Sequence, residues 1–307
     1  MFLEKSKNII NMNKIILKYL KILITQTILL LVLVSCGINT NPDDISLKTQ
    51  NSLSVIIISS DISLGLNQIK FALLNLEGNP ILNEENKLKV FISPLDSPQL
   101  KKSISIEWEP WPISGGVYST NIDFKTSSYW KINVLYEDSE DLRGEAIIEV
   151  KEKSQTPKVG NIPPKIHTKI ISDKSSLALI TSDINPKPDL YKFDFHEVIG
   201  EKPIVINFST PSFCKSGTCS PIIENIKKLS EEFKENIVFI HVEIYDNPKE
   251  IIDSGNPNLG KISEAVTEWN LPSEPWTFLV NSSGKIVSKH ESFIGYEELK
   301  KMIQNLK

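Results

Sequence analysis

The sequence predicts an all-β sandwich over residues 53–152, followed by an α/β domain over residues 165–307. Short alternating segments separated by turn residues indicate the sandwich, and a buried apolar strand followed by an amphipathic helix indicates the α/β domain. Between them, residues 153–164 (KSQTPKVGNIPP) are typical of an extended linker. A chain of 307 residues is also long for a single compact core.

The front domain contains alternating segments, as in 129–136, where Trp130, Ile132, Val134 and Tyr136 occupy every second position. This period marks half-buried strands. Seven short strands in about 100 residues favour an immunoglobulin-like sandwich. The expected strands are 53–59, 69–75, 87–92, 103–108, 117–124, 129–136 and 144–150.

Residues 116–124 and 129–134 together resemble the late strands of small exported sandwich domains of the FixH/YtkA kind. Some exported sandwiches bind copper through His and Met, but residues 37–166 contain no His, Met or Cys. We therefore expect no soft-metal site there. Trp108 and Trp111 are candidates for core or inter-domain packing, with a partner contact as the alternative.

The N-terminus has a lysine-containing segment followed by a short apolar stretch, residues 22–34. This pattern is typical of a secretory signal. The stretch ends in Leu33-Val-Ser-Cys36, which resembles the lipobox of bacterial lipoproteins, where the cysteine is lipidated and becomes the mature N-terminus. We expect a signal peptide over 1–36, lipidation of Cys36 and a polar tether over 37–52; a plain membrane anchor is the alternative.

The charge balance bears on possible partners. A net charge of −4 gives no reason to expect nucleic acid binding. The sole arginine is Arg143. The α/β domain therefore contains no arginine that could stabilise an anion.

Two cysteines, Cys214 and Cys219, remain if Cys36 is lipidated. An exported compartment permits disulfides, so these two are expected to pair; two free buried thiols are the alternative. Residues five apart in a regular helix have Cα atoms roughly 8 to 9 Å apart, too far for a disulfide. Residues 215–218 should therefore form a turn, for which Gly217 is suited.

The α/β domain begins its regular structure with the apolar run 204–208 (IVINF), typical of a central strand. Ser220 and Pro221 are suited to the N-cap and first turn of a helix, which places Cys219 at the helix start. Expected helices cover 221–234, 261–270 and 296–306; expected strands cover 237–244, 277–280 and 285–287.

This domain resembles the thioredoxin superfamily, especially its exported TlpA/ResA-like branch. The resemblance is carried by Lys202-Pro-Ile-Val-Ile-Asn-Phe208, the cysteine pair at a helix start, Glu274-Pro-Trp-Thr-Phe-Leu-Val280 and Asn281-Ser-Ser-Gly-Lys-Ile-Val287. It implies a thiol–disulfide oxidoreductase with Cys214 as nucleophile and Cys219 as resolving thiol. The family has two residues between its cysteines, whereas this chain has four.

The resemblance also implies a cis peptide at Pro275, in a loop facing the cysteines. Glu274, Trp276 and Phe213 would then face a docking substrate, with core packing as the alternative for Trp276. Asn207 stands where some relatives place a buried acid for proton transfer. An amide cannot titrate, so proton handling must differ or depend on Glu274.

Rival classes lack key residues. A peroxiredoxin needs an arginine beside its thiolate, and a Sco-like copper chaperone needs a histidine that residues 269–274 lack. We therefore expect no metal and no cofactor. A non-enzymatic lipoprotein with a structural disulfide remains an alternative. Expected partners are exported protein thiols or disulfides, a membrane electron donor or acceptor, and the membrane itself through the lipid anchor.

Overall fold

The computed structural model describes residues 53–306, apart from 113–114, 138 and 172–176. The expected signal peptide, the tether and Cys36 lie outside the described residues. Within the described residues, no helix has the length and apolar character needed to cross a membrane.

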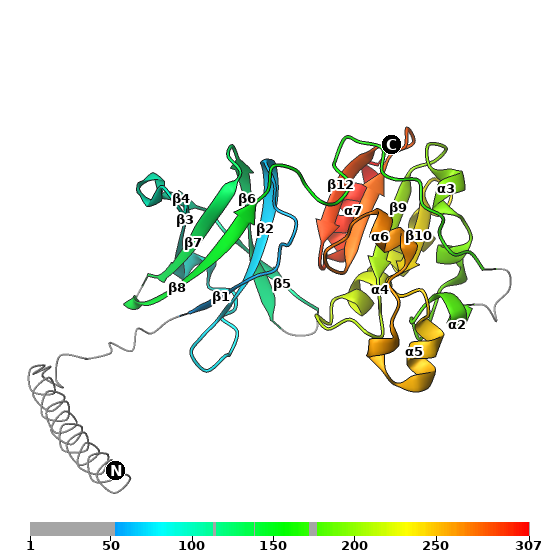
Figure 1. The fold of residues 1–307 in the computed structure, drawn as a ribbon, viewed down its shortest axis with the longest axis horizontal. Coiled ribbons are helices and arrows are strands. Elements are labelled where there is room, and N and C mark those ends of the chain that lie inside the picture. The colour runs from blue at the N-terminus through cyan, green and yellow to red at the C-terminus, as the bar shows by residue number, and fades with distance from the viewer. Residues whose placement is uncertain (1–52, 113–114, 138, 172–176, 307) are drawn as a thin grey trace, which may run out of the picture. The chain divides into compact units, whose positions relative to one another are not determined.

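The front part consists of strands in two four-stranded antiparallel sheets (Figure 1). One sheet has the order β1-β2-β6-β5, and the other has the order β4-β3-β7-β8. The strands are β1 (Ser54–Ile57), β2 (Gly65–Leu74), β3 (Leu88–Pro94), β4 (Lys102–Ile104), β5 (Glu107–Pro110), β6 (Gly116–Phe124), β7 (Ser128–Tyr136) and β8 (Ser139–Val150).

The two sheets share one apolar core. Phe71 and Tyr118 come from the first sheet, Ile132 and Val134 come from the second, and all four are fully buried. The predicted alternation in β7 is therefore confirmed for the positions that point inward. Trp108 packs its ring against Tyr118 at a centroid distance of 5.1 Å, in agreement with a packing role.

One expected strand was wrong in its extent. The segment 103–108 is two strands in different sheets, because β4 pairs with β3 whereas β5 pairs with β6. Ile104, Ile106 and Trp108 continue the apolar alternation across the break, so the sequence does not reveal it.

The second part contains a four-stranded mixed sheet with the order β10-β9-β11-β12. Strand β10 runs parallel to β9, whereas β11 is antiparallel to both β9 and β12. The strands are β9 (Ile204–Ser209), β10 (Val238–Glu243), β11 (Trp276–Val280) and β12 (Ile286–Glu291). The helices are α2 (Leu177–Ile180), α3 (Phe195–Val198), α4 (Cys219–Phe233), α5 (Pro248–Ser254), α6 (Glu264–Glu268) and α7 (Tyr296–Gln304).

Strand β9 is the central element, and all six of its residues are buried. Its alternate residues enter two apolar clusters. Ile206 and Phe208 pack with Trp269 on one face, and Val205 packs with residues of α4 and α7 on the other. A continuous apolar run is the expected pattern for a strand buried on both faces.

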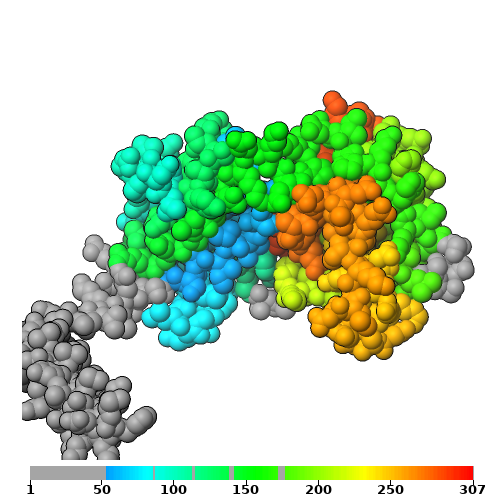
Figure 2. Space-filling view, in the orientation of Figure 1, coloured from blue at the N-terminus to red at the C-terminus, as the bar shows by residue number. Residues whose placement is uncertain are grey.

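Several helices differ from the sequence prediction. Helix α6 spans only Glu264–Glu268, and α5 was not predicted. Helix α5 lies at the surface of the molecule, in gold in Figure 2. Helix α4 begins two residues earlier than expected, at Cys219, which matters for the site described next.

Candidate active site

The cysteine pair lies in the connection from β9 to α4. Cys214 and Cys219 form a disulfide, with Cα atoms 6.0 Å apart. Gly217 has a φ of 69°, in the left-handed region that favours glycine. The expected turn between the two cysteines is therefore confirmed.

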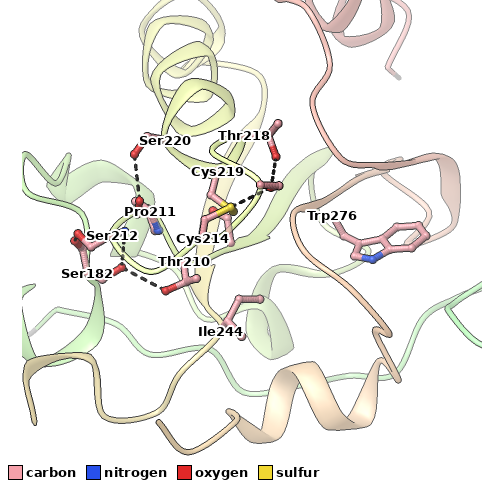
Figure 3. Close-up of a disulfide and its surroundings, with 12 residues drawn as sticks. Ser182, Thr210, Pro211, Ser212, Cys214, Thr218, Cys219, Ser220, Ile244 and Trp276 are labelled. Carbon is pink, nitrogen blue, oxygen red and sulfur yellow. Dashed lines mark hydrogen bonds between the residues drawn. A yellow bond between two sulfur atoms is a disulfide. The ribbon is translucent and has the colours of Figure 1, made fainter. Parts of the chain in front are cut away.

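The two cysteines differ in exposure. Cys219 is the first residue of α4 and is fully buried, whereas Cys214 is partly exposed. The positive end of a helix dipole stabilises a nearby thiolate. The disulfide thus joins a partly exposed cysteine to a buried one at the start of α4, and Figure 3 shows both beside the helix.

The expected cap of α4 was wrong. Thr218 is the N-cap residue and makes no capping hydrogen bond through its side chain. The hydroxyl of Ser220 instead donates to the carbonyl of Pro211 at 3.1 Å, because the helix already includes Cys219 and Ser220. This bond ties the start of the helix to the loop that precedes Cys214.

The hydroxyl of Ser216 lies beside the sulfur of Cys214. Ser216 Oγ lies 3.2 Å from Cys214 Sγ and 2.7 Å from Thr218 Oγ1. The backbone N–H of Cys214 donates to the carbonyl of Thr210 at 3.1 Å. These contacts hold Cys214 in a single-turn loop between the sheet and the helix.

The loop before β11 also lies next to the cysteine pair. The Glu274–Pro275 peptide is cis, which confirms the expectation for Pro275, and Pro275 is buried. A carboxylate oxygen of Glu274 and the two sulfur atoms all lie within 4.8 Å of one another. The carboxyl group of Glu274 therefore lies beside the disulfide bond.

The environment of Glu274 disfavours its charge. Burial and the nearby Glu243 raise the pKa of Glu274 to about 7, against a hydrogen bond from the backbone of Thr210. Glu274 Oε2 is buried without a hydrogen-bond partner among the described residues. Burial likewise raises the pKa of Glu243, although Ser182 N–H donates to this carboxylate at 2.7 Å.

The other expected substrate-facing residues separate into two groups. Phe213 is partly exposed and packs edge-on against Tyr245, with ring centroids 5.9 Å apart. Trp276 is 3% exposed, stacks on Phe278 and points away from the disulfide in Figure 3. The indole of Trp276 is therefore a core side chain, which corrects its expected substrate-facing role.

Asn207 and His241 belong to a buried polar chain. Asn207 Nδ2 donates to the carbonyl of Trp276 at 3.1 Å, and Ser209 Oγ donates to Asn207 Oδ1 at 2.6 Å. Ser209 Oγ in turn lies 3.0 Å from His241 Nε2. Asn207 thus has a structural environment with satisfied hydrogen bonds.

Sequence reasoning missed Glu243, Thr210 and Ser182. Thr210 contacts both carboxyl groups, through its backbone to Glu274 and through its hydroxyl to Glu243. The signal available in the sequence was Glu243 itself, an acid at the end of an apolar strand run, where an ionised side chain is costly to bury.

No protein-family model and no curated protein matches this sequence. The solved structures that resemble it include the following three. A protein from Chlorobium tepidum described as a thiol:disulfide interchange protein DsbE has 13% identity and a TM-score of 0.35, covering 49% of this chain and 99% of its own. StoA from Bacillus subtilis has 15% identity and a TM-score of 0.29, and the match covers 40% of this chain and 94% of StoA. The pneumococcal exposed lipoprotein thioredoxin Etrx1 from Streptococcus pneumoniae has 14% identity and a TM-score of 0.29. The match covers 37% of this chain and 91% of Etrx1. The solved structures that this chain resembles thus include a thioredoxin and a thiol:disulfide interchange protein.

Proposed function

We propose that this chain is a membrane-anchored, extracytoplasmic thiol–disulfide oxidoreductase that acts through Cys214 and Cys219. The observation that carries the proposal is the unequal exposure of the two cysteines that form the disulfide before α4. Cys219 is fully buried and Cys214 is partly exposed. Exchange needs one accessible sulfur and a second that resolves the intermediate.

The chemistry follows from that asymmetry. A substrate thiolate attacks Cys214 Sγ, the bond between Cys214 and Cys219 breaks, and its electron pair leaves on Cys219 Sγ. The substrate is then joined to Cys214 in a mixed disulfide. A second substrate thiolate attacks the substrate sulfur and releases Cys214 as thiolate, so the substrate dithiol is oxidised and the cysteine pair is reduced. The reverse sequence reduces a substrate disulfide.

The loop at Pro275 is proposed as the surface on which a substrate docks. Support comes from Glu274, whose carboxylate lies beside the disulfide, and from Phe213, the partly exposed residue that precedes Cys214 in the chain. The proposed substrates are thiols or disulfides of exported proteins, and a membrane electron donor or acceptor resets the pair.

The front part is proposed to be an immunoglobulin-like domain over 53–152, joined by the linker 153–164 to the redox domain over 165–307. Support comes from the strand orders β1-β2-β6-β5 and β4-β3-β7-β8. They correspond to the A-B-E-D and C′-C-F-G sheets of that fold. Lipidation of Cys36 is proposed from the lipobox pattern and would place both domains outside the cytoplasm.

The proposal is tested by trapping. We expect Cys219→Ser to form a stable mixed disulfide with glutathione when incubated with glutathione disulfide, because Cys214 is accessible and no second thiol can displace the adduct. Cys214→Ser should form little adduct, since Cys219 is fully buried. Intact mass measures both. If neither variant forms an adduct, the disulfide is a structural one in a non-enzymatic protein.

A further inference from the structure

Three potential metal-binding atoms meet beside the Pro275 loop. The Sγ atoms of Cys214 and Cys219 and a carboxylate oxygen of Glu274 lie within 4.8 Å of one another. Zinc binds sulfur at about 2.3 Å and carboxylate oxygen at about 2.0–2.2 Å, so its ligand atoms lie about 3.5–4 Å apart in a tetrahedral site. The four residues between the cysteines also fall within the spacing of zinc-binding cysteine pairs, about two to four residues.

The charge around these atoms favours a cation. Glu274 Oε2 is buried without a hydrogen-bond partner among the described residues, and Glu243 is a second buried carboxylate that shares Thr210 with it as a hydrogen-bonding neighbour. Among the described residues, the structure records no ion pair for Glu243 or Glu274. Buried carboxylates without a cation are costly, and a bound dication removes that cost.

Reduction of the disulfide would add two further negative ligands at the same place. Cys219 lies at the N-terminus of α4, where the helix dipole favours the thiolate, and Cys214 is accessible from solvent. In the disulfide form the two sulfur atoms are bonded to each other and are not thiolate ligands. A metal site built from these residues therefore exists only in the reduced protein.

We propose that the reduced protein binds one zinc ion through the Cys214 and Cys219 thiolates and the Glu274 carboxylate, with water as the fourth ligand. Binding displaces one proton from each thiol and transfers no electron. The inference rests on the proposed function only in requiring a dithiol form of the pair. This proposal revises our expectation that the protein binds no metal. That expectation rested on the lack of a suitably placed histidine and did not consider Glu274 as a ligand.

The ligand set selects among metals. Two thiolates with a carboxylate and a water match the open four-coordinate zinc sites of proteins. Thiolates alone also suit copper(I), whereas a carboxylate as a third ligand suits zinc and adds nothing that the softer copper(I) prefers. The Glu274 carboxylate is therefore the part of the ligand set that points to zinc.

The experiment is an equilibrium zinc titration of the mature full-length protein. The protein is reduced with a phosphine, freed of reductant under anaerobic conditions, and titrated against a chromogenic zinc chelator. Cobalt(II) serves as a second probe, because thiolate–cobalt charge-transfer bands report sulfur ligation directly. Four variants are compared with the wild type: Cys214→Ser, Cys219→Ser, Glu274→Gln and, as a control, Glu297→Gln on the exposed surface of α7.

We expect one zinc per reduced chain, no tight zinc in the oxidised protein, and loss of binding in both cysteine variants. Glu274→Gln should bind at least about tenfold more weakly, since even changes outside the direct ligands cost about 10–100-fold. Glu297→Gln should match the wild type. Equal affinity in the oxidised and reduced proteins overturns the site, and wild-type affinity in Glu274→Gln overturns its carboxylate ligand.

The zinc titration involves no thiol–disulfide turnover, and the glutathione trapping experiment involves no metal. A protein that forms the Cys214 adduct and binds no zinc keeps the proposed function and loses this inference. A protein that binds zinc when reduced chemically and forms no adduct loses the proposed function alone.

Discussion

Tyr191 Oη lies 2.7 Å from His241 Nδ1 in the interior of the α/β part. On its other side, His241 Nε2 lies 3.1 Å from the carbonyl of Ser209. The assignment that satisfies both contacts has the tyrosine hydroxyl donating to Nδ1 and Nε2–H donating to the carbonyl, which is the neutral imidazole. His241 is therefore held uncharged inside the fold.

His241 should make stability depend on acid. Burial lowers the pKa of His241 to about 4. The unfolded chain takes up this proton below about 6.5, whereas the folded protein does not until about pH 4, so stability falls across that interval by up to about 1.4 kcal/mol per pH unit. Urea midpoints from pH 7 to pH 4.5 measure this loss.

The variant His241→Gln isolates this effect. It should be less stable at pH 7 by about 1–3 kcal/mol, because buried hydrogen bonds are rearranged, but it should lose less stability on acidification. His290, whose pKa burial also lowers to about 4, contributes equally in both proteins. Parallel acid profiles for the two proteins would show that His241 is not the buried neutral group.

Gly217 should be needed for the closed disulfide loop. Its left-handed φ of 69° costs a residue with a Cβ roughly 1–2 kcal/mol. We expect Gly217→Ala to lower the stability of the oxidised protein by about 1 kcal/mol in urea unfolding. Lys215→Ala, an exposed change in the same loop, is the control and should have a small effect. Equal effects of the two changes would mean that the conformation at residue 217 is unimportant.

Asp61 should protect the linker segment from proteolysis. Its carboxylate accepts hydrogen bonds from Ser154 Oγ at 2.6 Å, Gln155 N at 2.8 Å and Thr156 Oγ1 at 2.7 Å. Burial raises the pKa of Asp61, but these bonds and Lys289 outweigh it and lower the pKa to about 2. The stability that Asp61 contributes is therefore present above about pH 4 and is lost as the pH falls towards 2.

We expect Asp61→Asn to destabilise the protein by about 1–3 kcal/mol at pH 7 and to speed trypsin cleavage after Lys153 and Lys158. Two fragments that remain folded after the cut would support the proposed division into two domains. Asp253→Asn, at an exposed surface ion pair, is the matched control. Unchanged cleavage in Asp61→Asn would contradict the protective role of these hydrogen bonds.

Cys36 should determine membrane association. When the full chain is expressed in a bacterial host, we expect the wild type in the membrane fraction and Cys36→Ser either released or left unprocessed, because the acyl chains attach to this thiol. Fractionation with mobility on a gel measures both outcomes. A Cys36→Ser protein that stays membrane-bound with unchanged mobility would indicate an uncleaved anchor.

The sequence predicts most of the fold because its patterns are local. The apolar run in β9 and the alternation in β7 identify their strands without any knowledge of neighbours. The split of 103–108 into β4 and β5 depends instead on which strand each half pairs with. That pairing joins residues distant in the chain, so local periodicity does not encode it.

The candidate site also combines features that follow from local sequence with features that depend on distant segments. Cys214, Cys219 and the turn at Gly217 follow from spacing, and the cis peptide at Pro275 follows from a resemblance over a short motif. The proximity of Glu274 to both sulfur atoms, and the burial of Glu243 behind it, arise where β10 and the loop before β11 meet the β9–α4 connection. A contact among three separate segments cannot be read from any one of them.

The reduction potential of the Cys214–Cys219 pair tests the central claim most directly. It is measured by equilibrating the full-length protein in graded mixtures of reduced and oxidised glutathione and counting free thiols by mass after alkylation. An exchange-active pair should equilibrate with glutathione at a potential above about −300 mV. A potential below about −300 mV, with slow exchange, is the behaviour of a structural disulfide and would contradict the oxidoreductase account.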